Sequence, residues 1–173
     1  MTGPEVRRLE DGSISLVGLP PWFVAALIEL PDLLADDGNE KVRKRLYPDP
    51  SDDANQKEEW KRLVVPELFA LVASAREVVR ADLAKLEPAR GRPTEWNVKI
   101  PAKHVNAWIS ALQAGRLALA ARHDIGELEM EGRAEKLEEE RQLALVKIHL
   151  LALVQEMLLD EPGRAPEPPA QAG

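Results

Sequence analysis

Two charged residues, Arg116 and Glu156, lie at positions where a helix should be apolar. An arginine and a glutamate can form an ion pair with each other or bind a charged ligand. By the helical step of about 100° per residue, Arg116 lies on the same stripe as Val105 in a helix that we predict over 101–122. Glu156 lies in the apolar stretch 143–159. A buried guanidinium without a partner is very costly, so we predict a hydrogen-bonded ion pair between Arg116 and Glu156. The simplest interpretation is a polar core clasp between the two longest helices. The alternatives are an anion-binding site built on Arg116 and an arginine that extends to solvent.

The other reactive side chains do not form a recognisable catalytic or metal-binding motif. His123, His149 and Glu156 include metal-ligand types, but there is neither the Glu-x-x-His pair of di-iron bundles nor a His-Glu-x-x-His motif. Gly-x-Ser-x-Gly, a glycine-rich phosphate loop and cysteine are all absent from the sequence. We therefore expect no catalytic residue, no metal and no cofactor, and we interpret the two histidines as core or boundary residues.

A basic cluster near the N-terminus indicates a different kind of site. The stretch 6–17 alternates around Asp11-Gly12, which predicts a hairpin, and the basic run KVRKR follows at 41–45. A basic hairpin beside helices is reminiscent of a winged helix. However, the formal net charge is −7 and the pI is about 5.1, which makes nucleic-acid binding less expected than a solvated charged surface. In this alternative, the contacting residues are Arg7, Arg8, Lys41, Arg43, Lys44 and Arg45.

The apolar stretch 143–159 should organise the fold. It reads LALVKIHLLALVQEMLL and is apolar on nearly every side of a helix. Such a helix is either buried by its neighbours or lies in a membrane, and this one is somewhat short for a span and has polar residues in its middle. We predict a central helix wrapped by the rest of the chain, with both Leu150 and Leu153 buried against other helices.

The remaining pattern predicts a mainly α fold with a small antiparallel sheet. Strands are expected at 6–10, 13–17 and 96–100, with the last strand pairing with the hairpin. The stretch 32–55 is rich in proline and acidic residues and is predicted to be a loop. Four or five helices should form a bundle-like domain; they are predicted at 21–30, 54–63, 66–86, 101–122 and from 130–134 to 159.

The length of 173 residues suits one domain with a real core. We assign this single helical domain to residues 1–160. Residues 161–173 are rich in proline and alanine and are expected to form a disordered tail that can be deleted without loss of stability. The N-terminus has no apolar region typical of a secretory signal, so a cytoplasmic location without membrane attachment is expected.

Three short motifs are similar to elements of one known bacterial family. Arg45-Leu46-Tyr47-Pro48-Asp49 is similar to that family's Arg-Leu-Phe-Pro-Asp element. Trp108-Ile109-x-x-Leu112-Gln113-x-x-Arg116-Leu117-Ala118-Leu119 resembles its Trp-Leu-x-x-Leu-Asn-x-Leu-Arg-Leu-Ala-Leu signature, and Val154-Gln155-Glu156-x-Leu158 resembles its closing Leu-Gln-Glu-x-Leu. On these motifs the chain resembles the uncharacterised family called domain of unknown function twenty-seventeen, over about 42–159. The chain departs from the family at Gln113, where asparagine is usual, and at Leu150 and Leu153, where tryptophans are expected.

This resemblance implies a mostly helical cytoplasmic protein without an established activity. Family members are often encoded near an adaptor of the Clp protease, and some carry the label of transcriptional regulator. We therefore expect a non-enzymatic interaction or regulatory protein, linked to Clp-type protein turnover and acting on a protein partner whose identity the sequence leaves open. The alternative is a nucleic-acid-binding transcriptional regulator that uses the hairpin and the basic loop.

Overall fold

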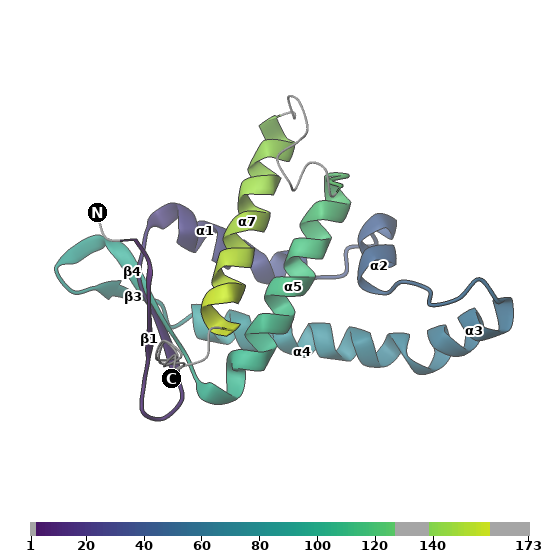
Figure 1. Cartoon of the computed structure of the whole chain (residues 1–173), viewed down its shortest axis with the longest axis horizontal. Coiled ribbons are helices and arrows are strands. Elements are labelled where there is room, and N and C mark those ends of the chain that lie inside the picture. Colours follow the sequence, from purple (N-terminus) through teal and green to yellow (C-terminus); the bar gives the residue numbers. More distant parts are fainter. Residues whose placement is uncertain (1–2, 127–138, 160–173) are drawn as a thin grey trace, which may run out of the picture.

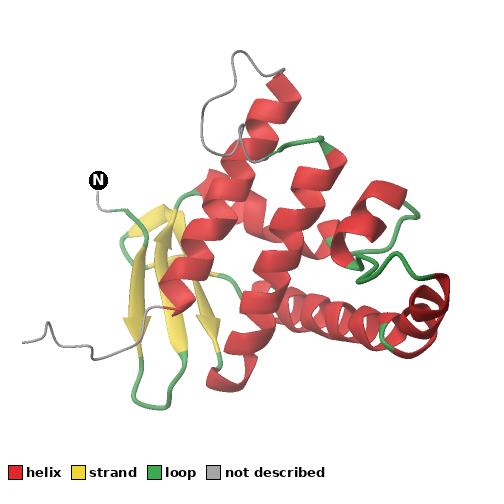
Figure 2. Ribbon diagram, turned by 45° about the vertical axis from the view of Figure 1, so that its right-hand side comes forward, coloured by secondary structure: helices red, strands yellow, loops and turns green. Residues whose placement is uncertain are grey.

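The computed structural model describes residues 3–126 and 139–159. Helices make up most of it, and a small sheet packs against one side of the helical part (Figures 1 and 2). The predicted mainly α fold with a small antiparallel sheet is therefore confirmed. The predicted tail at 161–173 and the predicted start of the last helix at 130–134 lie outside the described residues.

The sheet has four antiparallel strands in the order β1-β2-β4-β3 among the described residues. The predicted hairpin is present, and Gly12 in its turn has a φ of 83°, a conformation that glycine adopts without strain. The predicted strand at 96–100 belongs to the longer β4, which pairs with β2 as expected. Strand β3 was not predicted, because Pro88 and Gly91 indicate only the end of a helix. The strands are β1 (Glu5–Arg8), β2 (Ile14–Leu19), β3 (Glu87–Ala89) and β4 (Arg92–Ile100).

One face of the sheet is buried under the helices. Ile14 and Leu16 alternate with less buried residues along β2, as side chains on a half-buried strand do. They pair with Ile100 and Val98 of β4, which are also buried. The two central strands thus supply a continuous apolar floor for the helical layer.

The helices follow the predicted segments with one addition. Asn39 caps a short helix, α2, by accepting a hydrogen bond from the Val42 backbone N–H, in a stretch that we predicted as loop. Seven residues are too few to establish a helical period, so the pattern did not reveal it. Pro31 lies inside α1 and does not end it. The described helices are α1 (Pro21–Leu33), α2 (Glu40–Leu46), α3 (Ala54–Leu63), α4 (Val65–Leu83), the short 3-10 helix η1 (Ala102–His104), α5 (Val105–Arg122) and α7 (Glu139–Leu159).

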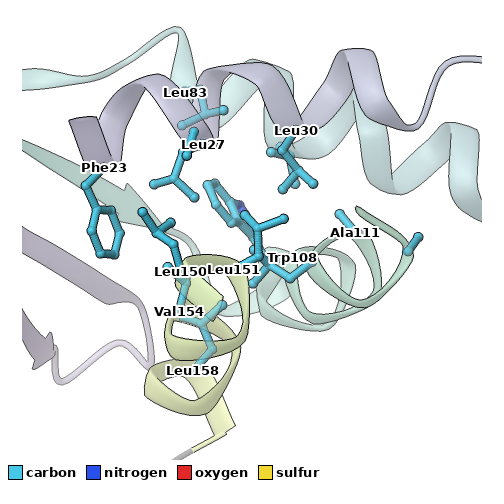
Figure 3. Close-up of a cluster of buried hydrophobic side chains, with 14 of the residues drawn as sticks. Phe23, Leu27, Leu30, Leu83, Trp108, Ala111, Leu150, Leu151, Val154 and Leu158 are labelled. Carbon is cyan, nitrogen blue, oxygen red and sulfur yellow. The ribbon is translucent and has the colours of Figure 1, made fainter. Parts of the chain in front are cut away.

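Helix α5 is the hub of the fold, in place of the predicted C-terminal helix. It packs against α1, α2, α4 and α7. Its Trp108 is completely buried, and Figure 3 shows the indole between Leu27 and Leu30 of α1 and Leu151 of α7. Gly115 lets α1 approach closely, since a Cβ atom there would lie 2.3 Å from Leu30 Cδ1. The small side chains of α5 allow four helices to gather around it.

Helix α7 is buried on one face only, so the prediction of a wrapped helix was wrong. Leu150 and Leu151 are buried in the core, as predicted for Leu150. Leu153 was also predicted to be buried, but 46% of it is exposed, and Val146 is exposed as well. Within the described residues α7 is long and apolar enough to cross a membrane by length and composition alone, a test that core helices of soluble proteins also pass. Among the described residues, no other element covers the outer face of α7 at Val146 and Leu153.

Candidate functional site

Arg116 does not form the predicted ion pair. Its Nη1 atom donates hydrogen bonds to Gln155 Oε1 at 2.9 Å and to Gln113 Oε1 at 3.4 Å. Among the ion pairs between described residues, none joins Arg116 to Glu156. A step of one residue turns a helix by about 100°, so Gln155 points toward α5 while Glu156 faces solvent. Both Arg116 and Glu156 nevertheless line one open groove between α5 and α7.

A buried carboxylate that sequence analysis missed joins α4 to the start of α5. Asp82 is only 2% exposed. Its carboxylate accepts a hydrogen bond from Trp108 Nε1 at 2.9 Å, and His104 Nδ1 lies 2.9 Å from the same oxygen. Asp82 falls between Val79 and Leu83 on the apolar stripe of α4, so its position was a detectable signal. We identified the stripe of α4 from its apolar residues alone, and for this reason Asp82 was not predicted.

The Asp82–His104–Trp108 cluster has the chemistry of a structural clasp. A carboxylate that holds one imidazole nitrogen also orients histidines in catalytic and metal sites. Within the described part of the chain, however, no group of three or more His, Cys, Asp or Glu side chains is placed to hold a metal ion. Burial of the carboxylate with two hydrogen-bonding partners instead satisfies a polar group in the core and fixes how α5 begins against α4.

The structure does not bring the predicted basic residues together. Arg7 and Arg8 belong to β1, whereas Lys41 to Arg45 belong to α2, and Figure 1 shows α5 and α7 between these two elements. Arg8 Nη2 donates to the carbonyl oxygen of Met157 at 3.3 Å, and Arg7 lies 3.6 Å from the carboxylate of Glu5. The structure therefore separates the six residues that the nucleic-acid alternative groups into one contact surface.

Charged pairs hold α2 against the end of α5. Lys41 Nζ lies 2.8 Å from Asp124, and its hydrogen bond lowers the pKa of that carboxyl group. Arg122 Nη1 donates to Asp37 at 2.8 Å and likewise lowers the pKa of Asp37.

Next to these pairs, Arg43 donates to Asp36, which lowers the pKa of Asp36 in the same way. Lys44 and Arg45 have no hydrogen-bond or ion-pair partner within the described residues, and they line an open groove beside Ile125 at the end of α5. Lys44 and Arg45 are therefore the two side chains of the basic run 41–45 that are available for a ligand.

The most unusual surface is a helical arm formed by Ala54–Ser74, which comprises α3 and the first half of α4. It projects beyond the body of the molecule (Figure 1). None of its residues is buried; the first buried residue of α4 is Ala75. Val64, Leu68 and Leu71 follow the i, i+4, i+7 spacing and continue the stripe that is buried farther along α4 at Ala75. The apolar stripe of α4 therefore extends beyond the hydrophobic core, and its part before Ala75 is not buried.

Capping interactions and one aromatic contact support this arm. Asp53 caps α3 by accepting hydrogen bonds from the backbone N–H groups of Asn55 and Gln56. Pro66 stands in the first turn of α4, where its missing N–H is tolerated. Tyr47, just after α2, stacks on Phe69 with ring centroids 4.4 Å apart and braces the side of the arm.

The fold and surface define a class of small, mainly α proteins with a sheet on one side and an uncovered helical arm. The chain belongs to the family described as Domain of unknown function (DUF2017), which matches residues 7–161. This confirms the resemblance noted from the three motifs. The curated proteins and the solved structures contain no match to the chain.

The structure gives each family-like motif a physical role. Tyr47 of the first motif packs on the arm, Trp108 of the second is the centre of the core, and Gln155 of the third binds Arg116. The three motifs therefore sit at contacts between helices.

Proposed function

We propose that this protein is a non-enzymatic interaction or regulatory protein whose helical arm docks a helix of a protein partner. The observation that carries the proposal is the uncovered stripe of α4. Leu71, at 66% exposed, lies one helical turn before the buried Ala75. Val64 and Leu68 on the same stripe are only half-buried. Apolar side chains that a helix leaves in contact with water are typical of protein-binding surfaces, because that contact is unfavourable.

The spacing of the stripe suggests the kind of partner. Val64, Leu68 and Leu71 match the i, i+4, i+7 anchors by which amphipathic helices pack against one another. Lys61 and Arg62, at the end of α3, are exposed and have no hydrogen-bond or ion-pair partner within the described residues. A partner helix with an apolar stripe and acidic flanking residues would complement this surface.

The resemblance to the family adds a biological setting to this proposal. Because members are often encoded near an adaptor of the Clp protease, we propose that the partner belongs to Clp-type protein turnover in the cytoplasm. The adaptor itself is the first protein to test.

The test compares two variants in which an exposed apolar side chain is replaced by glutamate. Leu71→Glu alters the arm, and the control Ile28→Glu alters α1, where Ile28 is 53% exposed. We expect Leu71→Glu to weaken binding to the purified Clp adaptor at least about tenfold in calorimetry, while Ile28→Glu leaves it unchanged. Both variants should keep the unfolding midpoint of the native chain, since neither position is in the core.

Equal binding by all three proteins would refute the arm as the docking surface. If the adaptor does not bind at all, the same three proteins serve as baits in a cell lysate. A protein retained by the native chain and by Ile28→Glu, but lost with Leu71→Glu, would then identify a different partner. Retention of the same proteins by all three baits would contradict the proposal.

Nucleic-acid binding is a second proposal, favoured by the two available cations of α2. Lys44 and Arg45 are exposed beside the groove at the end of α5. A transcriptional regulator that used them would bind duplex DNA with an affinity that falls as salt rises, because each phosphate contact releases counterions. The double variant Lys44→Glu/Arg45→Glu should then reduce the salt slope. Absence of binding at low salt would eliminate this second proposal.

A further inference from the structure

We propose that the outer face of α7 is a self-association surface, on which two copies of this chain pair antiparallel. Leu153 is 46% exposed at the centre of this face. Two open depressions lie next to it. The groove between α5 and α7 is lined by Arg116, His149 and Ala152, the other depression is lined by Met157 and Leu159, and Glu156 lines both. The exposed leucine next to these hollows gives the face an apolar centre that a second copy of the same face can cover.

The charges on this face are complementary to themselves. His149 and Glu156 are exposed, are seven residues apart and therefore share one side of the helix. Neither has a hydrogen-bond or ion-pair partner in the part of the chain that the structure describes. Each copy thus offers one imidazole N–H donor and one carboxylate acceptor along the same line.

An antiparallel pair satisfies both groups at once. His149 precedes Ala152 by three residues, and Glu156 follows Leu153 by three residues. A two-fold axis between Ala152 and Leu153 therefore places His149 of each copy opposite Glu156 of the other. In a two-fold antiparallel pair, residues on one side of the line of contact face residues on the same side of the partner helix. The two Leu153 side chains therefore also meet near the axis. The small side chain of Ala152 allows the two helices to approach closely there.

The surface that such a pair buries is small, which sets the strength of association. A contact made by one helix from each copy falls at the low end of protein interfaces, where complexes are weak and transient. The expected behaviour is a monomer–dimer equilibrium that depends on concentration. This inference does not rest on the arm, because the arm and the outer face of α7 are formed by different elements.

Sedimentation velocity on the full chain, from about 5 to about 500 μM, tests the proposal over the range expected for a small interface. The native chain should shift toward a dimer as its concentration rises. Leu153→Glu should weaken this shift at least about tenfold. The control is Leu143→Glu, because Leu143 is 56% exposed on the same helix but is offset by about 80° around its axis from Leu153. A monomer at every concentration, or equal loss with both variants, would overturn the proposal.

Exchanging the charges at positions 149 and 156 distinguishes the proposed antiparallel register from non-specific association. His149→Glu alone should remain monomeric, because its dimer would place two carboxylates opposite each other at both ends of the line of contact. Glu156→Lys alone should associate weakly, since it has lost the acceptor for His149. An equimolar mixture of the two variants should form a heterodimer, because the introduced lysine of one copy then meets the introduced glutamate of the other, while one native His149–Glu156 contact is kept. Failure of the mixture to associate better than either variant would refute the antiparallel register.

A variant of the arm distinguishes self-association through α7 from the proposed binding of a partner by the arm. Leu71→Glu should dimerise like the native chain and yet lose its protein partner, whereas Leu153→Glu should show the reverse. Loss of dimerisation with Leu71→Glu would assign self-association to the arm and overturn the proposal for α7.

Discussion

A missing side chain sets the distance between α1 and α5. Gly115 is buried, and an added Cβ atom would lie 2.3 Å from Leu30 Cδ1 and 3.4 Å from Leu151 Cδ1. Leu30 and Leu151 are themselves packed in the core, so they have little room to move. The glycine is therefore a packing requirement, although glycine weakens a helix interior.

Gly115→Ala should for this reason destabilise the protein despite the better helix propensity of alanine. Overpacking a core typically costs about 1–3 kcal/mol, which exceeds the gain of about 1 kcal/mol from propensity in most of that range. Urea unfolding should show a lower midpoint. Gly3→Ala is the control, since an added Cβ atom there meets nothing within 4 Å. A Gly115→Ala protein at least as stable as the native chain would show that Leu30 has room to repack.

Asp82 is the buried polar group on which the junction of α4 and α5 depends. Asp82→Ala would remove the acceptor from the completely buried Trp108 and from His104. An unsatisfied buried donor costs about 1–3 kcal/mol, so the variant should unfold at lower urea concentration. His104→Ala should cost less, because it leaves the Trp108 bond intact. If His104→Ala were as damaging as Asp82→Ala, the indole bond would contribute nothing measurable.

The two faces of α7 should respond differently to the same truncation. Leu150 is buried in the core, whereas Leu153 lies on the outer face. Leu150→Ala should lower the free energy of unfolding by about 2–5 kcal/mol, the usual range for a buried leucine. Leu153→Ala should change it by no more than about 0.5 kcal/mol, as for other surface positions. Urea unfolding at a concentration where the protein is monomeric measures both. Equal costs would mean that the outer face is covered in solution.

Stability should be distributed unevenly over the molecule. The arm of Ala54–Ser74 has no buried residue, whereas α5 is surrounded by four helices. Local opening is easiest where few apolar contacts must be broken. Hydrogen exchange followed by mass spectrometry should therefore show fast exchange in the arm and the strongest protection in α5. Addition of the arm's partner should slow exchange in the arm. Protection of the free arm equal to that of α5 would contradict this expectation.

The sequence alone determined the elements whose signals are local. The Asp11-Gly12 turn predicted the hairpin, and apolar periods predicted α1, α4 and α5. The continuous apolar character of 143–159 predicted the described part of α7. The three motifs were sufficient to indicate the family, whose match covers residues 7–161. These signals are readable because backbone conformation and helical period depend mainly on residues close together in the chain.

Only the tertiary structure decided what each apolar or charged face meets. A period identifies the apolar face of α4 but not how far its neighbours extend along that face, so the arm was not predicted. The strong hydrophobicity of 143–159 suggested the hub, yet α5 is the hub because its glycine and alanines let other helices approach closely. Arg116 was expected to meet Glu156 and instead binds Gln155, since a step of one residue turns the side chain by about 100° and the orientation of α7 against α5 selects the partner.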